Sequence, residues 1–121
     1  MVGDWLMVDG CDLWSMLQDD LASLQEEVAS YRKQGPRRAS TEAAYYAAKA
    51  KTVMLMKAGG ETATNITNRV KGDAEVNRLL EAKIAAECEY DATREAINAL
   101  KTSIRVLEGQ IAREWGSNAR N

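Results

Sequence analysis

The chain has 121 residues, a length that suits one domain with one hydrophobic core. It contains no His, no Phe and a single Pro, and its net charge is −2. Because histidine is the commonest general base and a frequent metal ligand, its absence excludes most catalytic triads and zinc sites. Together with many Ala, Glu, Lys, Leu and Arg residues, this composition predicts an all-α, non-enzymatic protein with no cofactor and no metal.

Residues 1–11 are interpreted as an N-terminal arm, and the first helix is predicted over 12–34. Its apolar residues recur in steps of three and four, which is the spacing of one helix face; they are Trp14, Leu17, Leu21, Leu24, Val28 and Tyr31. Gly35 can adopt the left-handed conformation that ends helices, and Pro36 lacks a backbone donor. The sequence therefore predicts that this helix stops before Gly35.

A second helix is predicted over 41–58, with Ser40 or Thr41 as its N-cap and Gly59-Gly60 as its end. A short helix is predicted over 62–70, where Thr62 can cap the first turn. Both helices precede a much longer one.

The longest helix is predicted over 74–115, with Asp73 as its N-cap and residues 116–121 as a tail. Twelve residues recur at steps of three or four, and their mean spacing near 3.5 is typical of a helix packed along its length; they are Val76, Leu79, Ala82, Ala86, Tyr90, Thr93, Ile97, Leu100, Ile104, Leu107, Ile111 and Trp115. Such a stripe requires a covering partner.

Two arrangements can cover the long helix: the two earlier helices lie along it end to end, or they cover one half and a second copy covers the other. We favour the second, an antiparallel helical bundle or coiled-coil hairpin, a single domain over 1–121 completed by dimerisation. The residues expected at this interface, or at the ends of the bundle, are Trp5, Trp14, Ile97, Leu100, Ile104, Leu107, Ile111 and Trp115.

The charge is uneven along the chain. Residues 1–31 carry −7, residues 32–57 carry +6, and residues 58–121 carry −1. Cations near tyrosines can contact phosphates and stack bases, although such a face is also typical of a solvated helix. The residues predicted to bind a partner or single-stranded DNA are Arg32, Lys33, Arg37, Arg38, Tyr45, Tyr46 and Lys49.

Three carboxylates, Glu87, Asp91 and Glu95, recur at four-residue spacing. We interpret them as solvated or as paired with the basic segment, because no Glu-x-x-His motif accompanies them. Cys11 and Cys88 are expected to be reduced thiols. A secretory signal begins with basic residues, but no Lys or Arg precedes Arg32. No apolar run is long enough to span a bilayer. A cytoplasmic protein without membrane contact is expected.

Several segments resemble a family of small uncharacterised helical proteins from phages and prophages of Gram-positive bacteria. The resemblance covers residues 42–116 and rests on Lys57-Ala58-Gly59, Thr62-Ala63-Thr64, Val70-Lys71-Gly72-Asp73, Ala86-Glu87-Cys88-Glu89-Tyr90-Asp91-Ala92, Glu95-Ala96-Ile97, Lys101 and Arg113-Glu114-Trp115-Gly116. Members of this family lie in early gene regions, near recombination and single-strand-binding functions. The resemblance implies a phage setting inside a bacterial host and carries no activity, catalytic residue or ligand.

Our leading hypothesis is a phage accessory protein that binds a host or phage protein, as an inhibitor of a defence system such as a CRISPR nuclease. A related version sequesters a nucleotide signal in pockets lined by Arg37, Arg38 and the tyrosines. The alternative is a recombination or replication accessory that binds single-stranded DNA through residues 32–57. An enzyme and a virion scaffold are the remaining alternatives.

Overall fold

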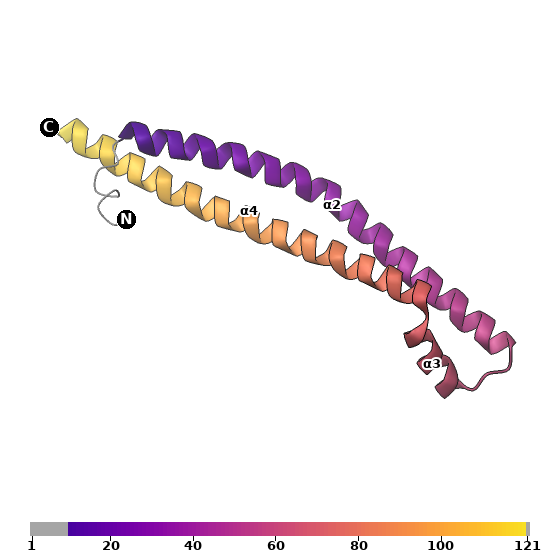
Figure 1. Cartoon of the computed structure of the whole chain (residues 1–121). Helices are drawn as coiled ribbons and strands as arrows, with labels where there is room; N and C mark the ends of the chain where they lie inside the picture. Colours follow the sequence, from indigo (N-terminus) through magenta and orange to yellow (C-terminus); the bar gives the residue numbers. More distant parts are fainter. Residues whose placement is uncertain (1–9, 121) are drawn as a thin grey trace. The chain divides into compact units, whose positions relative to one another are not determined.

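The structure, a computed structural model, describes residues 10–120, with side chains described for 12–116. In this part of the chain it contains three helices and no strands: α2 (Gly10–Ala58), α3 (Ala63–Gly72) and α4 (Ala74–Arg120) (Figure 1). The predicted all-α class is confirmed. The predicted arm 1–11 falls outside the described residues except for Gly10 and Cys11, which already belong to α2.

Helix α2 runs without a break through Pro36, so the predicted separation into helices 12–34 and 41–58 is wrong. Proline normally disfavours the α conformation of the preceding residue by clashing with its Cβ, and Gly35 has no Cβ. The lost backbone hydrogen bond to Arg32 remains a local cost. Thr41 does not cap a new helix, because its Oγ1 donates to the carbonyl of Arg38 one turn earlier in the same helix at 3.0 Å.

Helix α2 ends before Gly59-Gly60, as predicted, and a Schellman motif closes its C-terminus. Gly60 takes the left-handed conformation with φ of 80°, which is strained for residues that carry a Cβ. Its N–H donates to the carbonyl of Lys57 at 3.0 Å, and the N–H of Glu61 donates to that of Met56 at 3.3 Å. These two bonds satisfy carbonyls that would otherwise end the helix unpaired.

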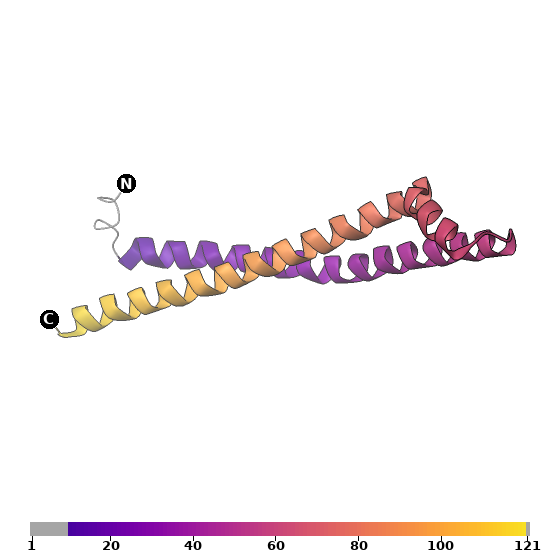
Figure 2. The ribbon, with the colours of Figure 1, turned by 90° about the horizontal axis from the view of Figure 1, so that it is seen from below.

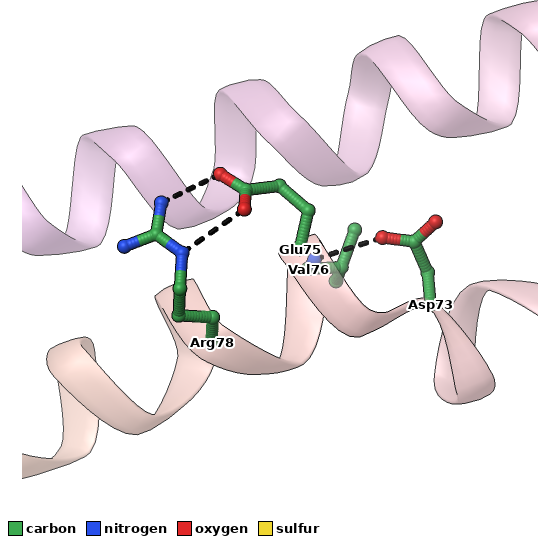
Figure 3. Close-up of polar contacts among 4 residues, drawn as sticks. All are labelled: Asp73, Glu75, Val76 and Arg78. Carbon is green, nitrogen blue, oxygen red and sulfur yellow. Dashed lines mark hydrogen bonds and ion pairs between the residues drawn. The ribbon is translucent and has the colours of Figure 1, made fainter.

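Asp73 separates α3 from α4 and serves both (Figure 3). Its N–H donates to the carbonyl of Val70 at 3.2 Å. Its Oδ1 accepts from the N–H of Val76 at 2.9 Å, which is the predicted N-cap. In the first turn of α4, Arg78 forms a bidentate ion pair with Glu75, with distances of 2.6 and 3.0 Å. Thr62 caps α3 as predicted, because its Oγ1 accepts from the N–H of Asn65 at 3.3 Å.

The chain divides into two compact units. The terminal unit comprises Met1–Ser30 and Thr93–Asn121, and the central unit comprises Tyr31–Ala92. Both long helices contribute a segment to each unit. The single domain predicted over 1–121 stays a prediction.

In the terminal unit the first part of α2 packs antiparallel to the last part of α4 (Figures 1 and 2). Its core contains buried aliphatic side chains from both helices, namely Leu13, Leu17, Ile104 and Leu107, with Leu21, Leu24 and Ile111 packed around them. Beside this core, Ser103 donates a hydrogen bond to Asp20 at 2.5 Å. Leu13 occupies the core position that the sequence pattern assigned to Trp14, which is 56% exposed.

In the central unit, α3 joins α2 and α4 and completes a second core. Ile66 and Val70 of α3 are buried with Val76 of α4. Four α2 side chains pack around them: Tyr45, Ala48, Val53 and Met56. Three helices therefore share this core, whereas two form the core of the terminal unit.

Segments of α2 pack on α4 in both units, so the predicted antiparallel hairpin is confirmed, and one copy covers α4 in each unit. The continuity of α2 explains this result, because its residues 10–30 reach the stripe that we assigned to a second copy. The predicted dimer stays a prediction. Helix α4 is confirmed from Ala74, and it extends to Arg120 through most of the predicted tail. Gly116 lies within this helix, where glycine disfavours the helical conformation but, unlike proline, keeps its backbone donor.

Candidate binding surface

Tyr90 of α4 contacts two side chains of α2 in the central unit, Tyr31 and Arg38. The rings of Tyr31 and Tyr90 are stacked with centroids 4.4 Å apart. The guanidinium carbon of Arg38 lies 4.9 Å from the centroid of the Tyr90 ring. Next to them, Arg37 pairs with Glu89 at 3.0 Å. These contacts lie on both sides of Pro36 and connect α2 with α4 where the helix lacks a backbone hydrogen bond.

Tyr45 and Tyr46 form a second aromatic pair, with ring centroids 5.1 Å apart. The ammonium groups of Lys49 and Lys83 lie 5.9 and 6.0 Å from the centroid of the Tyr45 ring, within cation–π range. Tyr45 is partly buried, whereas Tyr46 is 52% exposed. Of the two predicted stacking tyrosines, Tyr46 therefore presents the more accessible ring.

Lys83 and Glu87 form an ion pair at 2.8 Å whose side chains are only 15% and 30% exposed. The hydrogen bond from Lys83 lowers the pKa of Glu87, assisted by the positive charges of Lys83 and Arg38 and opposed by desolvation. The same hydrogen bond raises the pKa of Lys83, again against desolvation. The pair is therefore ionised over a wider pH range than either group alone.

The predicted cations divide into two groups. Arg37, Arg38 and Lys49 contact Glu89, Tyr90 and Tyr45, respectively. Arg32 and Lys33 are exposed side chains earlier on α2. The carboxylates at four-residue spacing are likewise not equivalent, because Glu87 pairs with Lys83. Among residues with described side chains, no group of three or more potential metal ligands comes together. Cys88 is an exposed free thiol, and the side chain of Cys11 lies outside those described.

A cleft with a volume of about 310 Å³ lies between the C-terminal part of α2 and helix α3. Its apolar floor is formed by Val53, Ile66 and Val70. Lysines surround this floor, namely Lys49, Lys57 and Lys71, and the exposed residues Ala63 and Thr67 complete the wall. Of these residues only Lys49 was predicted individually as a binding residue, because the cleft depends on the position of α3 against α2.

Large apolar side chains remain exposed in both units. In the terminal unit Trp14 is 56% and Trp115 is 72% exposed, so neither seals the core. In the central unit Met54 is 70% and Leu55 is 65% exposed. Trp5 lies outside the described residues. These four exposed side chains are available to a partner.

Most residues of the predicted interface stripe are buried or partly buried within a single copy of the chain. Ile104, Leu107 and Ile111 pack on α2, Ile97 is buried, and Leu100 is partly buried. Their burial is explained within one copy. A role for them in a dimer therefore stays a prediction.

Within the described residues, no helix combines the length and hydropathy needed to cross a membrane. The chain matches no protein-family model, no curated protein and no solved structure.

Proposed function

We propose that this chain is a non-enzymatic binding protein that acts by attaching to another macromolecule. The observation that carries the proposal is the exposure of Trp14, Trp115, Met54 and Leu55. Tryptophan and methionine are enriched in protein interfaces, where burial of one large side chain can dominate the binding energy. A partner would bury the apolar area that folding leaves in water.

The proposed partner is a host or phage protein in the cytoplasm of a bacterium. The resemblance to phage proteins supports this setting, and inhibition of a defence nuclease is one specific form of it. The charge distribution favours binding that is selective for one partner. The central unit carries 11 basic and eight acidic side chains, whereas the terminal unit carries five basic and ten acidic side chains. Such opposite net charges can orient a partner on approach.

The test is affinity capture from bacterial lysate, compared between the wild type and two double variants. We expect W14A/W115A or M54S/L55S to lose a stoichiometric partner that the wild type retains. A matched Q18A/N98A variant changes exposed polar residues and should retain it. Capture of no stable partner by the wild type, or equal capture by all variants, would contradict the proposal.

A second candidate function is binding of single-stranded DNA through residues 32–57. It is favoured by the exposed ring of Tyr46 near Lys49, together with the exposed cations Arg32 and Lys33. The contacts of Arg37 with Glu89 and of Arg38 with Tyr90 count against it, because DNA would have to compete for both cations. Fluorescence anisotropy with an oligonucleotide should show affinity that falls steeply with salt and with R32E/K33E. Absent or salt-independent binding would remove this candidate.

A further inference from the structure

The lysine-rimmed cleft, formed by Lys49, Lys57 and Lys71 around the apolar floor, combines two properties that select a ligand. The described residues that line it include no acidic side chain. Ile66 and Val70 of the floor are only 5% and 6% exposed, so the floor belongs to the folded core and is preformed. A ligand therefore meets a fixed apolar surface with positive charge around it.

The shape of the cleft favours part of a larger ligand over a small molecule. Small-molecule sites usually bury most of their ligand. Here, by contrast, the three lysines, Ala63 and Thr67 are all exposed. A cleft this open can enclose one side chain while the rest of the ligand lies across its rim.

The chemistry of the floor favours a peptide over a nucleic acid. Single-stranded nucleic acids stack their bases on aromatic rings, but Val53, Ile66 and Val70 are aliphatic. An aliphatic floor binds an aliphatic or aromatic side chain by burying apolar area. The lysine ammonium groups can meanwhile reach carboxylates while their methylene stems extend the apolar wall.

We propose that the lysine-rimmed cleft binds an acidic segment of a partner protein. One apolar side chain of that segment lies on the floor, and carboxylates on either side of it pair with Lys49, Lys57 and Lys71. This inference rests on the proposed function, since it assigns the partner's chemistry at one site. Charge complementarity and the apolar floor together define the occupant.

Binding is tested by fluorescence anisotropy with a labelled synthetic peptide that carries a Leu-Leu pair between glutamates. Two control peptides replace the leucines by serines or the glutamates by glutamines. We expect each control peptide to bind about tenfold more weakly than the parent, as loss of one interaction of moderate strength would produce. Equal binding of the three peptides, or no binding of the parent peptide, would overturn the inference.

The site is located with variants of the full chain. We expect K49E/K57E/K71E to weaken binding of the parent peptide at least about tenfold, whereas K51E, on an exposed α2 position outside the cleft, has little effect. T67W should fill the cleft and block binding, and N68W on the exposed side of α3 should not. Helix content by circular dichroism verifies folding. Equal effects of the cleft variants and their controls would contradict the site.

The two proposals fail separately. If K49E/K57E/K71E still captures from lysate the protein that the wild-type chain captures, the cleft is not the binding site for that protein, and the proposed function stands. If neither protein captures a partner, the proposed function fails, whatever the peptide result. Loss of capture in the triple variant alone supports both.

Discussion

The terminal and central units differ in helix number, charge and aromatic content, although the same two long helices form both. The terminal unit has a two-helix core, a net charge of −5 and all three tryptophans of the sequence. The central unit has a three-helix core, a net charge of +3 and all four tyrosines. One helix pair therefore provides two chemically distinct surfaces, because the sequence of α2 and α4 differs between the two units and α3 packs on them only in the central unit.

The two units also use their aromatic residues differently. All four tyrosines of the central unit lie in ring contacts, Tyr31 with Tyr90 and Tyr45 with Tyr46, and Arg38 lies over the Tyr90 ring. In the terminal unit Trp14 and Trp115 are exposed beside a core that is entirely aliphatic among its described members. The tyrosines thus make contacts inside the central unit, whereas the two tryptophans add exposed apolar area to the terminal unit.

The largest effects are expected from truncating each core in turn. L107A and I66A each remove a side chain that is 5% exposed, and each should lower stability by about 2–5 kcal/mol. Near-ultraviolet circular dichroism can follow tryptophan and tyrosine separately during urea unfolding. We expect L107A to lower the urea midpoint of the tryptophan signal more than that of the tyrosine signal. I66A should do the reverse. Identical shifts of both signals would mean that the two units unfold as one.

Replacing the proline inside α2 should stabilise the central unit, which contains Pro36. P36A restores a backbone donor inside α2 and should stabilise the chain by about 1–3 kcal/mol, mainly in the tyrosine signal. The matched variant A43P places a proline elsewhere in the same helix, at an exposed position, and should cost about 3 kcal/mol or more. A loss of stability in P36A would contradict the continuous helix.

The contacts of Tyr90 should contribute less than the cores do. Y90L keeps an apolar side chain but loses the stacked Tyr31 ring and the Arg38 cation, at a cost of about 1–2 kcal/mol. Y46L removes a ring that is 52% exposed and should change stability by less than about 0.5 kcal/mol. The measurement is again urea unfolding. Equal effects of the two substitutions would show that the Tyr90 contacts do not stabilise the central unit.

Periodicity predicts the long helix well because burial along a helix repeats at a fixed interval. From Val76 to Ile111 every residue of the predicted stripe is buried or partly buried, and only Trp115 at its end is exposed. The caps at Thr62 and Asp73 are equally local, because each side chain accepts a hydrogen bond from the backbone N–H group three residues later in the sequence. Signals confined to one helix are therefore readable in the sequence.

Features that depend on contacts between helices were predicted poorly. The sequence marks a break at Gly35-Pro36, but it does not show that Tyr31, Arg37 and Arg38 contact α4 on both sides of the proline. The candidate site shows the same limit. Clustering of charge identified the basic segment, yet the cleft combines residues from two helices, and Lys71 lies outside that segment.

The smallest effect is expected from the ion pair between Lys83 and Glu87, and it should depend on pH. The lowered pKa of Glu87 means that its contribution is present above its usual value of 4.5 and is lost as the pH falls through the lowered pKa. The raised pKa of Lys83 means that its contribution is present below 10.5 and is lost as the pH rises through the raised value.

The melting temperature of E87Q should therefore lie slightly below that of the wild type near neutral pH. The difference should shrink in strong acid, where wild-type Glu87 also becomes neutral. E95Q changes an exposed carboxylate in the terminal unit and serves as the control. A difference between E87Q and the wild type that is independent of pH would show that the substitution acts through packing instead of charge.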